Sequence, residues 1–390
     1  MERNKGLFEL ALVAPPWWLI PSKNIVTATE HLVEDYSYNF NKEGYKSVVF
    51  SRRKDNTDIE DIKDLNKYKN TYIYTKVTFV DRKLFRNINS LFFYFLYILK
   101  VSFKIKKLGI RKIIVFQILP FCFWIKLINP NSKILYHIGN HELSKSENYY
   151  QYGFIPSSLA LKVFPKIYTI IPVSNHIRDG IVKRFPSIKN KCKTIYVGID
   201  SEIFKKGEKD KRKRIITYSG RVVPEKGVHL LVNVFNNLKK DFKDIELYIL
   251  GSGIGPNIPF DYFDIFKKEG IKMLGLLPRK DVANILRQSS IFVYPVIWEE
   301  PFGLAPVEAM AVGIPTVVSN TKSGYTEIIN DSNGYYFNSN DEKDLERVLK
   351  GLLSSSNGQK DICNKAVETI QKRLSWKDCI KNSIDCFTQP

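Results

Sequence analysis

The chain of 390 residues contains 60 Lys and Arg against 40 Asp and Glu, which gives a formal net charge of +20, and 44% of its residues are hydrophobic. This length allows two domains of ordinary size, and the near-average Gly and Pro contents exclude a collagen-like or low-complexity chain. The five cysteines lack the short spacings of zinc or redox motifs, so we expect free thiols in a reducing compartment.

No apolar stretch reaches the roughly 20 residues that a membrane-spanning helix needs. The start of the chain carries Glu9 within an apolar run and Pro15-Pro16 after it, which is typical of a strand and loop rather than of a signal peptide. We therefore expect a cytoplasmic protein without a membrane span.

Strands and helices alternate along the first half of the sequence. A helix is expected over His31–Asn41, ending near Gly44. The apolar runs that predict buried strands are Leu7–Ala14, Ser47–Phe50, Ile113–Phe116, Lys133–Ile138, Ile167–Pro172 and Thr194–Val197.

A second series of strands and helices begins after Lys205–Arg214, a polar stretch that predicts an exposed linker. Its first helix is expected over Val228–Lys240. Its predicted strands are Ile215–Tyr218, Glu246–Leu250, Ile271–Leu274, Ile291–Pro295 and Thr316–Ser319. This alternation predicts an α/β fold with parallel sheets. We place the domains at 1–200 and 201–374, with a last helix over 375–390 that could pack back on the first domain.

The segment Trp298–Met310, with sequence WEEPFGLAPVEAM, lies between a predicted strand and a predicted helix, Leu304–Val312. Such turns sit at the carboxyl edge of a parallel sheet, where α/β proteins bind ligands. Gly303 permits close backbone approach, and the amides at the helix start can bind an anion. Two carboxylates, Glu300 and Glu308, flank these amides and can accept hydrogen bonds from sugar hydroxyls.

A second candidate turn, Ser219–Gly227 with sequence SGRVVPEKG, also follows a strand and opens a helix. Arg221 and Lys226 offer positive charge to a diphosphate. The guanidinium of Arg221 can bind two oxygens at once, and the ammonium of Lys226 acts as a point charge. Neutralising a departing diphosphate makes it a better leaving group.

Together the two turns resemble the retaining glycosyltransferases of family four, which belong to the group 1 glycosyl transferases. Glu300 and Glu308 match the paired glutamates of that family, and Gly220, Arg221 and Lys226 match its diphosphate-binding turn. The resemblance implies a GT-B fold, in which two Rossmann-like domains have parallel sheets that face each other across a central cleft. It also implies transfer of a sugar from a nucleotide diphosphate sugar to a hydroxyl of a glycan or lipid-linked acceptor, as in cell-surface polysaccharide or glycolipid synthesis.

The resemblance assigns a role to each matching residue. Glu300 and the amides of Phe302, Gly303 and Leu304 would bind the donor sugar, and Glu308 would bind the nucleotide ribose. Arg221 and Lys226 would hold the diphosphate, and the backbone near Leu274 and Gly275 would contact the base. No cofactor and no metal ion are expected. A family histidine that contacts the donor sugar could be either His137 or His141.

The basic residues are concentrated in the first half, where residues 1–200 carry a net charge of +16. Arg82 to His141 contains 11 basic residues and no acidic one. Within it, Leu91–Lys107 could form a helix that lies on an anionic membrane, on the inner face of the cell membrane, or a buried helix of the domain. The stretch has no recognised nucleic-acid module, so no nucleic-acid partner is expected.

Two alternatives stay open beside sugar transfer. One is a nucleotide-sugar epimerase of similar fold, against which the Glu300/Glu308 segment argues. The other is an inactive, membrane-associated partner subunit, against which the complete set of donor-site motifs argues.

Overall fold

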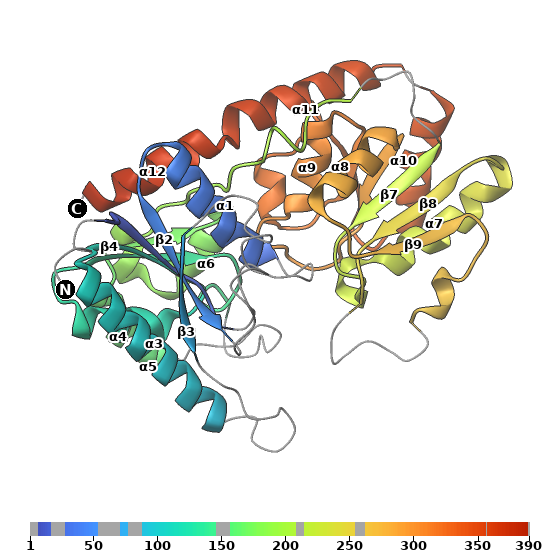
Figure 1. Cartoon of the computed structure of the whole chain (residues 1–390). Coiled ribbons are helices and arrows are strands. Elements are labelled where there is room, and N and C mark those ends of the chain that lie inside the picture. The colour runs from blue at the N-terminus through green and yellow to red at the C-terminus, as the bar shows by residue number, and fades with distance from the viewer. Residues whose placement is uncertain are drawn as a thin grey trace. The chain divides into compact units, whose positions relative to one another are not determined.

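The computed structural model of the chain describes residues 7–16, 28–53, 71–76, 88–145, 157–207, 214–253, 262–355 and 357–388. The chain divides into two compact units (Figure 1). The first comprises Met1–Val173, Ile177–Ile195 and Lys377–Pro390, and the second comprises Ser174–His176 and Tyr196–Trp376.

The described part of the first unit contains a parallel sheet of six strands in the order β3-β2-β1-β4-β5-β6. Its strands are β1 (Leu10–Val13), β2 (Ser47–Arg53), β3 (Tyr72–Lys76), β4 (Lys112–Phe116), β5 (Lys133–Ile138) and β6 (Thr169–Pro172). Its helices are α1 (Ala28–Lys42), α3 (Ile88–Leu108), α4 (Leu119–Ile128), α5 (Ser157–Val163), α6 (Asn175–Arg184, which begins in the second unit) and α12 (Trp376–Thr388). Figure 1 shows α3, α4 and α5 on one face of this sheet and α1 and α12 on the other.

The described part of the second unit contains another six-stranded parallel sheet, in the order β12-β11-β10-β7-β8-β9. Its strands are β7 (Ile215–Ser219), β8 (Glu246–Leu250), β9 (Ile271–Gly275), β10 (Ile291–Tyr294), β11 (Thr316–Ser319) and β12 (Tyr335–Phe337). Its α-helices are α7 (Val228–Asp241), α8 (Arg279–Gln288), α9 (Leu304–Val312), α10 (Glu342–Ser354) and α11 (Gln359–Arg373).

The central strands are short apolar runs because helices cover both faces of each sheet. All four residues of β1, β10 and β11 are buried. The two parallel α/β sheets confirm the predicted fold class. Within the described residues, no helix has both the length and the apolar character to cross a membrane.

The strand predicted over Thr194–Val197 is wrong. Among the described residues, two backbone hydrogen bonds join this part of the chain to β6, Lys193 N to Ile170 O at 3.0 Å and Ile195 N to Pro172 O at 3.1 Å. The chain passes to the second unit at Tyr196, which ends the pairing.

Helix α12 belongs to the first unit, although the residues before it belong to the second. Lys133 Nζ donates to Phe387 O at 2.7 Å, and Thr169 Oγ1 donates to Cys386 O at 3.3 Å. Cys379 Sγ donates to Tyr36 OH at 3.3 Å. These contacts fix α12 to strands β5 and β6 and to helix α1.

Candidate active site

Both candidate turns leave neighbouring strands of the second sheet. Strand β7 pairs with β10 in parallel, and the chain continues from β7 to β8 on one side and from β10 to β11 on the other. A parallel sheet opens a crevice outside the carboxyl ends of its strands where the strand order reverses in this way. The turns that carry Lys226 and Glu300 therefore lie at the position where this fold binds ligands.

Gly227 allows the two turns to touch. It has a φ of +65°, and a Cβ at this position would lie 1.9 Å from the carbonyl oxygen of Pro295. A second backbone contact, from Ile297 N to Glu225 O at 3.1 Å, joins the same turns. Only glycine provides both the left-handed conformation and the space for this approach.

Lys226 is a nearly buried cation, with 5% of the residue exposed. Its Nζ forms an ion pair with Glu300 Oε2 and donates to Tyr294 OH at 3.1 Å. It also lies 5.2 Å from the ring centroid of Trp298, where the face of the ring attracts a cation. An ammonium group has three donors, and among the described residues these two oxygens are its only acceptors, which leaves one donor for a ligand.

The charge of Lys226 depends on its partner. Burial lowers the pKa of Lys226, and the Glu300 carboxylate acts in the opposite direction. Burial and the same carboxylate raise the pKa of Tyr294, so its phenol stays protonated. A buried cation that is held by one carboxylate is suited to receive a second anion.

Glu300 is held through both its side chain and its backbone. Trp298 Nε1 donates to Glu300 Oε2 at 2.8 Å, the same oxygen that binds Lys226. The Glu300 amide donates to Ser323 Oγ at 2.8 Å, and its carbonyl accepts from Gly324 N at 2.9 Å. Oε1 of Glu300 accepts no hydrogen bond within the part of the chain that the structure describes, so it can accept one from a ligand hydroxyl.

Another carboxylate, Glu327, binds the chain segment that contacts the loop of Glu300. It accepts hydrogen bonds from Asn175 N at 2.9 Å, His176 N at 2.6 Å and Tyr196 OH at 2.6 Å. These contacts hold the first residues of α6 on the second unit and place negative charge at the start of a helix.

The segment fixed by Glu327 in turn contacts the loop of Glu300. Ser174 Oγ donates to Pro301 O at 2.6 Å, and His176 Nε2 lies 3.4 Å from Glu299 Oε2. The residues on both sides of Glu300 are therefore tied to Ser174 and His176.

The other predicted diphosphate and ribose ligands have their own partners in the structure. Arg221 lies 3.9 Å from Glu225, and 43% of its side chain is exposed. Glu308 lies 3.6 Å from Arg279, the first residue of α8. The structure thus pairs Lys226 with Glu300 and gives each of Arg221 and Glu308 a different partner. Their roles remain predictions.

The predicted amide donors stand at the start of α9. Gly303 precedes the helix with a φ of +88°, and no side chain caps this end. Phe302 is 5% exposed, and Leu304 begins the helix. Leu274 and Gly275 end β9 on the same sheet, where Gly275 accepts a hydrogen bond from Gly251 N at 2.7 Å.

The two alternative histidines lie in the first unit. His137 is fully buried in β5, with ring centroids 5.4 Å from Tyr36 and 5.0 Å from Phe116, and burial lowers its pKa to about 3. His141 follows the carboxyl end of β5 and shares a 2.9 Å hydrogen bond with Ser144 Oγ. His141 is also buried, with 2% of the residue exposed, so which of the two histidines contacts the donor sugar stays a prediction.

Sequence reasoning missed Tyr294, Arg279 and Glu327 as parts of this site. Tyr294 has a recognisable signal, because it is the last residue of the strand before the glutamate segment. Among the described residues, no group of three or more His, Cys, Asp or Glu is arranged to hold a metal ion.

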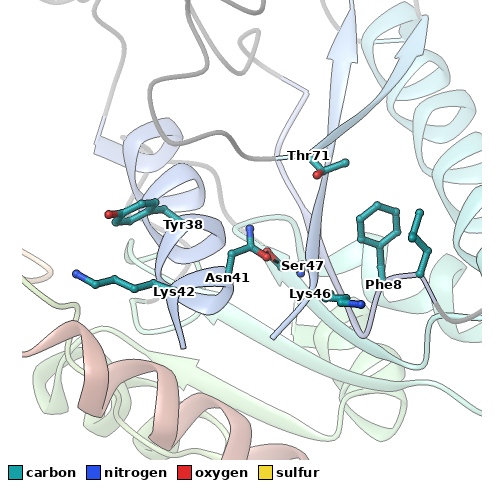
Figure 2. Close-up of a pocket in the computed structure, with 8 residues that line it drawn as sticks. Phe8, Tyr38, Asn41, Lys42, Lys46, Ser47 and Thr71 are labelled. Atoms are coloured by element: carbon teal, nitrogen blue, oxygen red, sulfur yellow. Dashed lines mark hydrogen bonds between the residues drawn. The ribbon is translucent and has the colours of Figure 1, made fainter. Parts of the chain in front are cut away.

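A cavity of about 670 Å³ lies elsewhere, in the first unit (Figure 2). Its lining comes from the last turn of α1 and from residues at the amino ends of β1, β2 and β3, namely Leu7, Phe8, Tyr38, Asn41, Lys42, Lys46, Ser47 and Thr71. The amino edge of a parallel sheet is opposite to the edge that binds ligands in such folds. We therefore place the candidate site at the turns after β7 and β10.

Comparison with known proteins identifies relatives of the second half of the chain. Residues 199–369 match the family model described as Glycosyl transferases group 1. Spore coat protein SA of Bacillus subtilis (strain 168) is 26% identical over 243 residues, which cover 56% of this chain and 64% of that protein. The capsular polysaccharide biosynthesis glycosyltransferase CapM of Staphylococcus aureus is 21% identical over 219 residues, which cover 53% of this chain and 57% of that protein. These matches span less than two thirds of the length of either relative.

The fold has counterparts among solved structures over nearly the whole chain. The crystal structure of Anabaena HepE in complex with UDP and glucose superposes with a TM-score of 0.73 at 13% identity, covering 98% of this chain and all of that one. The architecture is thus that of the GT-B glycosyltransferases, as predicted. The residues that match the group 1 glycosyl transferase model, 199–369, contain Lys226, Glu300 and Glu308.

Proposed function

We propose that the protein is a retaining glycosyltransferase of family four that moves a sugar from a nucleotide diphosphate sugar to an acceptor hydroxyl. The observation that carries the proposal is the buried Lys226–Glu300 pair, which lies within the matched domain at the carboxyl edge of its sheet. Among the described residues, the pair leaves one donor of the ammonium group and one carboxylate oxygen without a hydrogen-bond partner. A sugar diphosphate needs this combination, since it has an anionic leaving group next to neutral hydroxyl donors.

In the proposed reaction, the bond between the anomeric carbon and the diphosphate oxygen breaks while a bond to the acceptor oxygen forms on the same face. The leaving phosphate oxygen takes the proton of the acceptor hydroxyl. Lys226 and Arg221 stabilise the charge that develops on the diphosphate, which supplies the role that a metal ion has in other transferases. Glu300 Oε1 and the amides at the start of α9 orient the sugar, Glu308 binds the ribose, and the end of β9 contacts the base.

The relatives suggest which substrates to test first. HepE was crystallised with UDP and glucose, and CapM is named for capsular polysaccharide biosynthesis. We therefore propose UDP-sugars as the first donors to test, with a glycan or lipid-linked acceptor of cell-surface polysaccharide or glycolipid synthesis. A lipid-linked acceptor would place a cytoplasmic enzyme at the inner face of the cell membrane.

The test is a screen of UDP- and GDP-sugars for hydrolysis and transfer, run with and without EDTA. One nucleotide series should raise the melting temperature and be turned over, because a ligand that binds only the folded state stabilises it. EDTA should leave the rate unchanged. Conversion of the donor to its epimer without release of nucleotide diphosphate would contradict sugar transfer, and lack of turnover with every donor and acceptor would support an inactive subunit.

A further inference from the structure

Helices α3, α4 and α5 form a continuous face over the first sheet that carries no acidic side chain. Helix α4 packs between α3 and α5, and the rings of Phe95 and Trp124 meet at 4.9 Å across the first contact. The sequences of all three helices contain lysine and lack Asp and Glu. Every charged side chain of these three helices is therefore basic.

The outer side of α3 is apolar along its centre and basic along its edges. At 100° per residue, Phe92, Leu96, Leu99 and Phe103 fall on one stripe of the helix. Phe92 is 54% exposed and Phe103 is 58% exposed, although aromatic side chains of this size usually find cover. Three exposed lysines flank the stripe, and they are Lys100, Lys106 and Lys107.

The two other helices also expose apolar side chains, although Leu159 and Leu161 are two positions apart and face different sides of α5. Leu127 of α4 is 62% exposed, and Leu159 and Leu161 of α5 are 38% and 52% exposed. Of the nine large apolar side chains that are exposed among the described residues, five thus belong to these three helices. Exposed Lys162 follows Leu161 in α5.

We propose that this face of α3, α4 and α5, hereafter the basic apolar face, docks the protein on the surface of a lipid bilayer that carries anionic headgroups. The phenylalanine and leucine side chains would enter the boundary between headgroups and acyl chains. The lysines at the edges would extend their charged ends to the headgroups. The helices lie on the membrane and do not cross it.

The charge of the face favours this occupant over a second copy of the chain. Two copies that met face to face would bring the lysines of α3 close to like charges, which is unfavourable in a buried contact. An anionic bilayer supplies both the apolar medium and the opposite charge. The proposal does not depend on sugar transfer, because membrane binding can be measured without a donor.

The test is co-sedimentation of the full chain with vesicles of phosphatidylcholine alone or mixed with phosphatidylglycerol. The protein should bind the mixed vesicles, more weakly as salt rises, and bind neutral vesicles poorly. Reversing two lysines, Lys106→Glu with Lys107→Glu, should lower the partition coefficient about tenfold or more. Replacing the apolar centre, Phe92→Ser with Phe103→Ser, should lower binding to a similar extent and leave binding weak even at low salt.

Matched control variants test whether a loss of binding comes from the basic apolar face itself or from a change in net charge or exposed apolar surface. Lys360→Glu with Lys365→Glu changes the net charge equally on exposed positions of α11, and Met273→Ser with Leu276→Ser removes exposed apolar groups of the second unit. Both control variants should bind like the wild type, and circular dichroism verifies the fold of each. Equal binding by wild type and both face variants would overturn the proposal. So would a wild-type dimer that Phe92→Ser with Phe103→Ser dissociates in the absence of vesicle binding.

Discussion

Gly227 lies against Pro295 so closely that a methyl group on the glycine would come within 1.9 Å of the proline carbonyl oxygen. Gly227→Ala should therefore separate the turns that carry Lys226 and Glu300. The left-handed φ and the clash together should destabilise the second unit by about 2 kcal/mol or more, which thermal unfolding measures. Gly351→Ala is the control, because this glycine lies in α10 with open space around it, and it should be neutral or stabilising by about 0.5–1 kcal/mol. Equal unfolding temperatures for wild type and Gly227→Ala would contradict the packing described.

Replacement of Lys226 should abolish most of the proposed transfer. Lys226→Gln removes the cation but keeps much of the side chain, and we expect kcat/KM to fall about a hundredfold or more, as for loss of one preorganised charge at a leaving group. Steady-state rates with the donor found by the screen measure this. Lys272→Gln is a matched control, since Lys272 also pairs with a glutamate, Glu246, but is 49% exposed on β9. Activity of Lys226→Gln within a few-fold of the wild type would remove Lys226 from the site.

Glu300→Gln should be strongly non-additive with Lys226→Gln. Each single change leaves the other member of a buried pair without its partner, which costs more than loss of both charges together. The unfolding free energies of the two single variants and the double variant give this coupling directly. Additive effects would mean that the two side chains do not form a pair in solution.

Glu327 should act on catalysis as a positioning residue. Glu327→Ala releases the amides of Asn175 and His176, and we expect kcat to fall about tenfold with little change in the KM for the donor, because the loop of Glu300 loses support while the ligands stay in place. Glu327→Gln keeps an oxygen acceptor and should restore part of the rate. A Glu327→Ala variant that changes only thermal stability would show that this carboxylate has a structural role alone.

His137 should make the protein less stable in acid. Its folded pKa is lowered to about 3 from an ordinary value of 6.5, so between these values the unfolded chain binds a proton that the folded chain does not. The contribution of His137 to the free energy of unfolding is therefore complete above pH 6.5. It decreases as the pH falls towards 3, at up to about 1.4 kcal/mol per pH unit. Melting temperatures of wild type and His137→Leu between pH 4 and pH 8 test this. The wild type should lose more stability than the variant on acidification, and parallel losses would contradict a neutral, buried imidazole.

Much of the fold could be predicted from the sequence because apolar runs and helical periods are local signals. The helix predicted over Leu304–Val312 has these bounds in the structure, and the helix predicted from Val228 begins there. The segment Thr194–Val197 has an equally apolar pattern, but its course depends on the passage of the chain between units. That passage is not a local property.

The site was only partly predictable for the same reason. Lys226 and Glu300 were both expected at one sheet edge, but their direct pairing depends on contact between two turns 74 positions apart. The sequence also could not decide whether His137 or His141 contacts a ligand. Every residue of β5 after Lys133 is buried, so no alternation of apolar and polar residues shows which way the side chain of His137 points. Glu327 gave no signal, because its partners are backbone amides of a distant segment.

The position of α12 has a consequence for how the protein is made. Its buried side chains, among them Cys379 and Phe387, complete the core of the unit that the first half of the chain begins. The ribosome makes these residues only after the second unit, so an apolar surface of the early half stays uncovered until then. For the same reason, an N-terminal fragment that ends near residue 196 would lack the helix that covers one face of its sheet. Adding α12 as a separate peptide should help that fragment fold.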